Sequence, residues 1–251
     1  QTFRRGATLF DTGFHYVGAL GEGESLHTLF SYFDLMNLPW KKLDEDCFDE
    51  IVIGENAFAF ANKHQRFYER MSARFPKERE GLKKYVDFLK QVGDHIFDSF
   101  NLQNEGTFTN SLFARSAYEF LNETIKDPLL RKVLSGTSLK MELNAPTLPL
   151  YTFAQINDSF IRSAWRLRGG GMQIADKLVG GIQTMGGEVK TRSIVTYIKE
   201  EDGKVVGVTI NDEDYLEADW IISSTHPVYT VSLVGDSKKM RRIYRDRIAN
   251  L

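Results

Sequence analysis

The sequence has little cysteine, no long apolar run and almost no net charge, and each shortage excludes a class of protein. Cys47 is the single cysteine, so the chain forms neither an internal disulfide nor a cage of thiolate ligands, and we expect a cytoplasmic, reducing location. The 32 Lys and Arg residues nearly balance the 34 Asp and Glu residues, which argues against a nucleic acid as partner. No apolar run approaches the roughly 20 residues of a membrane span. The 251 residues suffice for one large domain or two small ones.

The sequence also lacks the motifs that mark hydrolytic, metal-binding and nucleotide-binding sites. There is no G-x-S-x-G elbow, and the acidic neighbours of Cys47 disfavour a nucleophilic thiolate. The histidines are scattered and form no H-E-x-x-H, so we expect no metal site. Neither G-x-G-x-x-G nor G-x-x-x-x-G-K-[ST] occurs, so a complete dinucleotide fingerprint or P-loop is absent. No catalytic side chain can therefore be assigned from the motifs.

Phenylalanine is missing from the last third of the chain, although it is abundant before. Sixteen of the 18 Phe residues lie between Phe3 and Phe120, and the last two are Phe153 and Phe160. The chain is therefore two regions of different composition, and we place the boundary near residue 165.

The aromatic-rich first part is predicted to consist mainly of helices around a hairpin. Apolar residues recur at helical spacing in several stretches, and Gly54-Glu55-Asn56 separates two β-rich runs like a hairpin turn. The predicted elements are helices at 25–35, 67–75, 82–96, 116–125 and 128–135 and hairpin strands at 48–53 and 57–61. Asp127-Pro128 separates the last two helices.

The second part is predicted to contain a helix followed by three strands. Gly169-Gly170-Gly171 opens an amphipathic helix that ends at Gly186-Gly187, and turn-rich sequences separate strands at 188–198, 205–210 and 215–223. The glycines before the helix can admit a phosphate at its positive end, or they only permit close packing. The expected fold class is α+β. A mixed sheet covered by helices forms the first part, and a partial α/β domain with a three-stranded β unit forms the second.

Several short motifs occur in a fixed order along the second part. A glycine turn at Gly170-Gly171-Met172 opens the helix and a glycine pair at Gly186-Gly187 ends it. A V-x-x-I strand at 195–198, a D-G-x-x-x-G-V hairpin at 202–208 and an A-D-x-x-I-S strand at 218–223 follow. Upstream, FDTGFHYVG at 10–18 is similar to a D-x-G-G-x-x-x-G turn. In this order the motifs resemble the phytoene desaturase and retinol saturase branch of the FAD-dependent, amine-oxidase-like flavoproteins.

The resemblance implies roles for individual residues. Gly13, Phe14 and His15 match the turn that passes close to the flavin ring, with Phe14 in place of the usual second glycine. Val195 matches the strand residue whose backbone contacts the adenine of FAD. The strand end that returns toward the cofactor corresponds to Ser223, Ser224 and Thr225. Tight packing at a sheet edge explains these small residues equally well, and His15 either hydrogen-bonds near the flavin or caps a turn.

The resemblance also implies a division of the chain and an activity. Residues 1–20 and 166–251 correspond to parts of an FAD domain, and residues 21–165 to a domain that binds an apolar, isoprenoid-like substrate. The G-x-G-x-x-G turn and the second flavin segment of the family have no counterpart here, so we expect an internal fragment of a longer protein. The parent is expected to be an FAD-dependent oxidoreductase that desaturates, saturates or isomerises a C–C bond by hydride transfer. The fragment alone is expected to lack FAD and activity.

An alternative remains open from the residues themselves. The stretch 238–251 carries six basic residues and an apolar helical stripe, and the Phe-rich part can enclose an apolar ligand. A non-catalytic module that binds an apolar ligand or a membrane surface would use both features. A peripheral contact with a membrane is thus a further expectation, although such a stripe is also typical of an ordinary packed helix.

Overall fold

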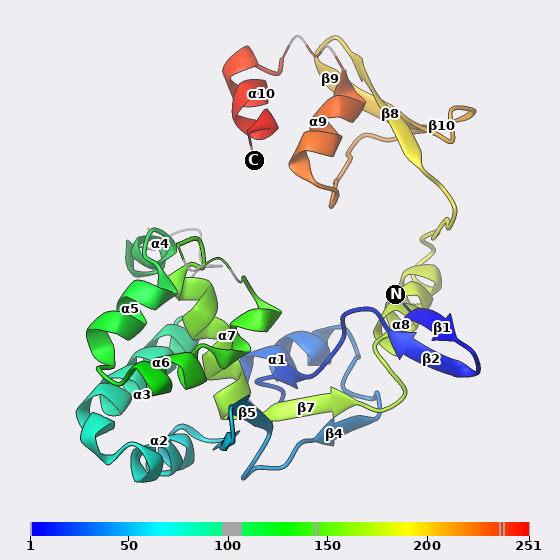
Figure 1. Cartoon of the computed structure of the whole chain (residues 1–251). Coiled ribbons are helices and arrows are strands. Elements are labelled where there is room, and N and C mark those ends of the chain that lie inside the picture. Colours follow the sequence, from blue (N-terminus) through cyan, green and yellow to red (C-terminus); the bar gives the residue numbers. More distant parts are fainter. Residues whose placement is uncertain are drawn as a thin grey trace. The chain divides into compact units, whose positions relative to one another are not determined.

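The computed structural model describes residues 2–96, 107–142, 144, 146–235, 237 and 239–250 (Figure 1). Contacts between residues divide the chain into an N-terminal unit, Gln1–Gly181, and a C-terminal unit, Ile182–Leu251. This division by contacts falls later in the chain than the compositional boundary near residue 165. The predicted assignment of 1–20, 21–165 and 166–251 to cofactor and substrate domains stays a prediction.

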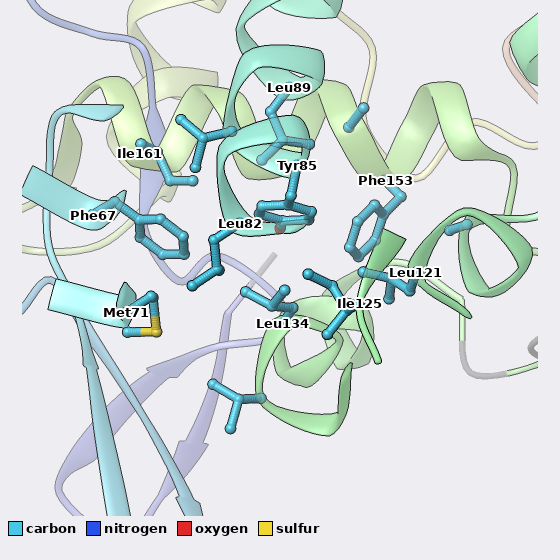
Figure 2. Close-up of a cluster of buried hydrophobic side chains, with 14 of the residues drawn as sticks. Phe67, Met71, Leu82, Tyr85, Leu89, Leu121, Ile125, Leu134, Phe153 and Ile161 are labelled. Carbon is cyan, nitrogen blue, oxygen red and sulfur yellow. The ribbon is translucent and has the colours of Figure 1, made fainter. Parts of the chain in front are cut away.

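The core of the N-terminal unit is built by amphipathic helices. They are α2 (His64–Arg74), α3 (Arg79–Asp94), α5 (Ala117–Thr124), α6 (Pro128–Leu134) and α7 (Leu150–Arg162), which Figure 1 shows grouped together. In α3, Leu82, Tyr85, Val86 and Leu89 follow the i, i+3, i+4, i+7 spacing of one helix face, and all four are buried. Figure 2 shows the rings of Phe67, Tyr85 and Phe153 in one cluster with aliphatic side chains from α3, α5 and α6. The phenylalanine-rich composition thus forms a single large core.

A buried ion-pair network ties three of these helices together. The Asp158 carboxylate in α7 is 2% exposed and accepts a hydrogen bond from His64 Nε2 of α2 at 2.6 Å. Arg162 Nε donates to the other oxygen of Asp158 at 2.5 Å, and the same guanidinium pairs with Asp94 at the end of α3 at 2.6 Å. Both carboxylate oxygens are therefore satisfied, as a buried charge requires.

Small antiparallel sheets complete the N-terminal unit. β1 (Thr2–Arg5) pairs with β2 (Thr8–Asp11), and β5 (Asp49–Ile53) pairs with β6 (Asn56–Phe60). A third sheet has the order β3-β7-β4 and consists of β3 (Val17–Gly18), β7 (Ala164–Leu167) and β4 (Trp40–Lys42). The remaining described elements are α1 (Ser25–Tyr32), the 3₁₀ helices η1 (Pro76–Glu78) and η3 (Gly136–Lys140), α4 (Thr107–Phe113) and α8 (Met172–Thr184), whose last residues belong to the C-terminal unit.

The C-terminal unit is a three-stranded antiparallel sheet with helices packed beside it. The sheet has the order β10-β9-β8 and consists of β8 (Val195–Glu201), β9 (Lys204–Ile210) and β10 (Asp214–Glu217). Figure 1 shows α9 (Pro227–Val234) beside β8, and α10 (Arg242–Ala249) follows it. Asp202 and Gly203 both have positive φ, +49° and +78°, as a two-residue hairpin turn requires. The core of this unit is small and comprises Ile198, Val208, Ile210 and Leu233.

The α+β fold class is confirmed, with differences in detail. The hairpin and the helices predicted around 25–35, 67–75, 82–96, 116–125 and 128–135 are present, and Asp127 caps α6 by accepting hydrogen bonds from two backbone N–H groups. The predicted three-stranded β unit is present in the C-terminal unit, and the described strands of the N-terminal unit form three small antiparallel sheets where a mixed sheet was expected. The strand predicted at 188–198 begins only at Val195, because the hairpin turn aligns the seven residues of β9 with the seven of β8. The strand predicted at 215–223 ends at Glu217. The last helix is α10, and Lys238 and Leu251 lie outside the described residues.

Candidate functional site

The residues predicted to contact a flavin fall into two groups, one in each unit. Gly13, Phe14 and His15 form the loop between β2 and β3 of the N-terminal unit. Val195 begins β8 of the C-terminal unit, and Ser223, Ser224 and Thr225 precede α9 in the same unit. His15 borders a cavity of the N-terminal unit, and the four residues of the second group line a cavity of the C-terminal unit.

The N-terminal cavity has a volume of about 410 Å³ and lies between β3, α1 and α7. Its walls are mostly apolar and comprise Val17, Gly18, Ala19, Leu26, Leu29, Ile96, Ile156 and Phe160. Strand β3 lies directly on α7, because Ala19 N donates to Ser159 O at 2.8 Å and a Cβ on Gly18 would overlap the Ser159 backbone. Its volume and apolar lining are those of a pocket for a small organic molecule.

Polar groups gather at one wall of this cavity. Lys140 Nζ donates to Tyr16 Oη at 2.5 Å and lies 2.7 Å from Asp49 Oδ2, and the Tyr16 hydroxyl donates to the same Asp49 oxygen at 2.5 Å. Lys140 and Tyr16 line the cavity, whereas Asp49 lies behind them on β5. The ammonium group also lies 4.1 Å from the centre of the Tyr16 ring and 5.4 Å from that of Phe160. This arrangement holds the cation in one place against two aromatic faces.

The charge state of this cluster follows from its contacts. Burial and the hydrogen bond to Asp49 raise the pKa of the Tyr16 phenol far above its ordinary value, so Tyr16 stays neutral. Burial alone would raise the pKa of Asp49, but the hydrogen bonds from Lys140 and Tyr16 outweigh it and lower that pKa. Asp49 is therefore ionised at neutral pH, and its charge offsets that of Lys140.

One residue of the predicted flavin loop, His15, borders the same cavity. His15 lines the cavity, and its Nδ1 accepts a hydrogen bond from the Tyr16 backbone N–H at 2.8 Å. Gly13 is exposed, and no atom lies within 4 Å of the place that a Cβ would take. Phe14 instead turns inward against Trp40, with ring centres 6.4 Å apart, and against Gly171. Gly13 and His15 are thus exposed in this loop, whereas Phe14 anchors it.

The glycines before α8 serve close packing. Gly169 and Gly170 have φ of +86° and +95°, which L side chains rarely adopt. A Cβ on Gly171 would lie 2.6 Å from Phe14 Cγ, and the Gly171 N–H donates to Asp11 Oδ1 at 3.1 Å. A carboxylate of the chain itself thus lies where a phosphate would meet the helix N-terminus. Of the two interpretations of this turn, the structure favours packing.

The C-terminal cavity brings the other predicted residues together. Val195, Ser223, Ser224 and Thr225 line a space of about 350 Å³ between β8, α9 and the segment before α9. Ser223 Oγ lies 3.0 Å from Thr225 Oγ1 and 2.7 Å from Thr230 Oγ1. The Tyr229 hydroxyl donates to the Val195 carbonyl oxygen at 3.3 Å. The four residues predicted to contact the cofactor in this unit are therefore neighbours, and Tyr229 and Thr230 of α9 lie beside them.

The sequence did not point to several of these residues. Tyr16, Asp49 and Lys140 come from three separate segments and carry no motif; the only signal was the position of Tyr16 next to His15. Tyr229 and Thr230 lie on α9, which was not predicted, although Pro227 at the first helical position and His226 as its cap were visible signals.

Other classes of site find no support in the part of the chain that the structure describes. Burial raises the pKa of the Cys47 thiol, and the Glu50 and Asp44 carboxylates raise it further, which agrees with the argument against a nucleophilic thiolate. Among the described residues, no three His, Cys, Asp or Glu side chains form a group that could hold a metal ion. None of the helices described here is long and apolar enough to cross a membrane.

The family follows from comparison with known proteins. The model of the family described as flavin containing amine oxidoreductase matches residues 1–244. The chain therefore belongs to this family of flavoproteins, and the resemblance seen in the motifs is confirmed.

Relatives within the family are retinol reductases. All-trans-retinol 13,14-reductase of Danio rerio is 27% identical over 250 residues, which cover 89% of this chain and 40% of the relative. The protein of the same name from Rattus norvegicus is 25% identical over 231 residues, which cover 84% of this chain and 38% of the relative. The chain thus spans about two fifths of the length of these relatives.

Solved structures show the same fold at lower identity. An oxidoreductase from Methanosarcina mazei superposes with a TM-score of 0.65 at 18% identity, over 95% of this chain and 53% of its own. A putrescine oxidase double mutant from a redesign of cofactor binding superposes with a TM-score of 0.60 at 14% identity. The superposition covers 99% of this chain and 54% of the putrescine oxidase. These four proteins are oxidoreductases by name.

Proposed function

We propose that the protein that carries this chain is an FAD-dependent oxidoreductase that acts on a C–C bond of an apolar, isoprenoid-like molecule such as a retinoid. The observation that carries the proposal is the apolar cavity at the predicted flavin loop. His15 lies in the segment that resembles the flavin turn and also lines the cavity, so cofactor and substrate would meet there. The names of the retinol reductases among its relatives favour saturation over desaturation or isomerisation.

The lining of the cavity supports an apolar substrate over an amine, although the family name refers to amines. Among the described residues that line it, Lys140 is a cation and none is an Asp or Glu. An ammonium ion in this cavity would find no free counter-ion, because Asp49 is already paired with Lys140, and the loss of its hydration is costly in an apolar environment. A hydrocarbon body, in contrast, gains from burial against Leu26, Leu29 and Phe160.

Features of both units support the proposed flavin contacts. Gly13 leaves open space in which a planar ring can approach the backbone, and His15 borders it. In the C-terminal unit, the cavity at Val195 and Ser223 combines apolar walls with hydroxyl groups, which suits an adenine. When bound, reduced FAD supplies the hydride for a saturation, and a proton completes the addition. Oxidised FAD accepts a hydride in a desaturation. The chain's own residues hold the apolar body, exclude water and fix its orientation.

The reaction is tested on the full natural protein that contains this sequence. After purification, the flavin is reduced without oxygen, all-trans-retinol is added, and products are separated by chromatography. The proposal predicts that retinol gains two hydrogens for each flavin reoxidised. Reduced flavin that stays reduced in the presence of retinol and other isoprenoids would contradict it.

We propose further that the 251-residue chain by itself binds FAD weakly or not at all, because it contains no G-x-G-x-x-G turn for the pyrophosphate. Absorbance of the purified chain tests this directly. Less than one tenth of an equivalent of flavin is expected, and a stoichiometric yellow protein would contradict it.

A peripheral membrane contact through α10 is a separate proposal. Ile243 and Tyr244 are 62% and 49% exposed and lie beside Arg241 and Arg242, a combination that suits an anionic surface. Sedimentation with phosphatidylserine vesicles should decrease when Arg241 and Arg242 are replaced by Gln. Unchanged sedimentation would contradict this contact, and would also count against the membrane-binding version of a non-catalytic module.

A further inference from the structure

Two paired strands of the N-terminal unit place like charges opposite each other. Strand β4 pairs with β7, and Lys41 lies directly opposite Arg166 (Figure 1). Side chains in such a pair start about 4.5–5.5 Å apart, and like charges there are destabilising. Arg168 extends the same row, because its backbone N–H donates to the Pro39 carbonyl oxygen at 3.2 Å and residues two apart share one face. We call Lys41, Arg166 and Arg168 the cationic row.

The charges of the cationic row are not balanced by the residues that the structure describes. All three side chains are exposed, and no described Asp or Glu forms an ion pair with them. Lys42, the neighbour on the opposite face of β4, differs in this respect. It pairs with Glu45, and its ammonium group lies 6.0 Å from the centre of the Trp165 ring. The strand pair is thus neutralised on one face and strongly cationic on the other.

The backbone beneath the cationic row is fixed by the core of the unit. Further along the same face, Ala164 is fully buried and Leu43 packs against the core, and the Leu43 N–H donates to the Ala164 carbonyl oxygen at 2.8 Å. At the other end, Gln173 Nε2 donates to the Arg168 carbonyl oxygen at 2.7 Å. The strands therefore keep the three cations as neighbours before any ligand arrives, which lowers the cost of binding one.

The number and type of these cations select the chemistry of the ligand. Each guanidinium is a planar fork that matches two phosphate oxygens, and the ammonium adds a point charge. A phosphate monoester carries close to two negative charges and three acceptor oxygens, whereas a carboxylate carries one charge and two oxygens. We propose that the cationic row is a binding site for a phosphate monoester, either free in solution or in the headgroup of a lipid. This site is separate from the apolar cavity and does not depend on the proposed reaction.

Titration of the full 251-residue chain with inorganic phosphate tests the site. The expected dissociation constant is on the order of 1 mM, because each exposed ion pair contributes little. Acetate at the same ionic strength should bind about tenfold more weakly, since it has half the charge. Phosphate should also raise the unfolding temperature, because it binds the folded chain. Phosphate that binds no more tightly than acetate would overturn the proposal.

Reversal of one charge separates the loss of a ligand contact from a loss of folding. Arg166→Glu turns the repulsive pair with Lys41 into an attractive one, so it should abolish phosphate binding and raise the unfolding temperature in phosphate-free buffer. Arg168→Gln should weaken phosphate binding by about two- to fivefold. Lys42→Gln is the matched control and should leave the affinity unchanged. Undiminished phosphate binding in Arg166→Glu would refute the site; if that variant does not fold, undiminished binding in Arg168→Gln would refute it.

Two further arms distinguish the sources of the phosphate group. The chain with Arg241→Gln and Arg242→Gln, which removes the cations proposed for α10, is sedimented with phosphatidylcholine vesicles that contain phosphatidic acid, a monoester, or phosphatidylserine, a diester. A lipid source predicts sedimentation with phosphatidic acid that Arg166→Glu abolishes. A soluble source predicts binding of glycerol 3-phosphate while the chain stays in the supernatant. Failure of both arms would overturn the proposal, and neither arm requires flavin or a retinoid.

Discussion

The two units of this chain differ in how they are stabilised and in what they offer a ligand. The N-terminal unit buries rings of Phe67, Tyr85 and Phe153 completely or almost completely, whereas the core of the C-terminal unit has four residues that are 4–9% exposed. The first encloses an apolar cavity with a fixed cation; the second presents hydroxyl groups beside a sheet edge. The comparison teaches that the unit rich in phenylalanine has the large, deeply buried core, whereas the unit without phenylalanine has a small and more exposed one.

The largest expected effect comes from opening the aromatic core. Phe153→Ala should lower the free energy of unfolding of the N-terminal unit by about 3–5 kcal/mol, because it removes a fully buried ring and leaves a cavity. Hydrogen exchange read peptide by peptide would show the loss in that unit alone. Phe33→Ala is the control, since Phe33 is 47% exposed and should cost under about 1 kcal/mol. Equal losses from the two substitutions would break the contrast.

The next effect concerns the ion-pair network of α2, α3 and α7. Asp158→Ala should cost about 3 kcal/mol, because it leaves Arg162 and His64 without their shared buried partner. Asp94→Ala removes the other partner of the same Arg162, but Asp94 is 49% exposed, so we expect under about 1 kcal/mol. Urea unfolding of both variants measures the difference, and a larger loss for Asp94→Ala would refute it.

A pair of glycines separates packing from cofactor contact in the flavin loop. Gly171→Ala should destabilise the N-terminal unit by about 1–3 kcal/mol, because its Cβ meets Phe14. Gly13→Ala meets no atom within 4 Å, so stability should stay within about 0.5 kcal/mol while flavin affinity of the full natural protein falls. Thermal unfolding and flavin titration give the two readouts. A Gly13→Ala protein with unaltered flavin affinity would remove Gly13 from the predicted contacts.

The smallest effect is the pH dependence of the Tyr16, Asp49 and Lys140 cluster. The pKa of Asp49 is lower in the folded chain than its ordinary value of about 4, so its stabilisation is present above that value and is lost as the pH falls through the folded pKa. Asp49→Asn should therefore flatten the acid side of the stability curve of the N-terminal unit. Urea midpoints recorded between about pH 6 and pH 3 test this. If the urea midpoint of Asp49→Asn falls with decreasing pH as steeply as that of the native chain, the prediction is wrong.

Local sequence signals predicted the elements that depend on neighbours in the chain. The hairpin at Gly54 and the helix that ends at Gly186 follow from turn and cap residues, and both are present. Helix α9 was missed because Val228, Thr230 and Val231 favour strands and give no helical stripe. The strands predicted up to Ser223 and from Glu188 were too long, since pairing with β9 decides their extent.

The site could be predicted only where a family motif marks it. The loop at Gly13 and the strand at Val195 were found through the resemblance, and the roles given to Gly13, Phe14, His15, Val195, Ser223, Ser224 and Thr225 stay predictions. The cluster of Lys140, Asp49 and Tyr16 arises from η3, β5 and the loop before β3, which only the folded chain brings together. No spacing in the sequence encodes such a contact.

The most direct test of the account is an anaerobic comparison of two substrates on the full natural protein. Its reduced flavin is mixed with all-trans-retinol, and its oxidised flavin with putrescine, while flavin absorbance is followed. The account predicts reoxidation by retinol and no reduction by putrescine, because the described residues that line the cavity are mostly apolar and include no carboxylate. Reduction by putrescine together with inertness toward retinol would contradict it.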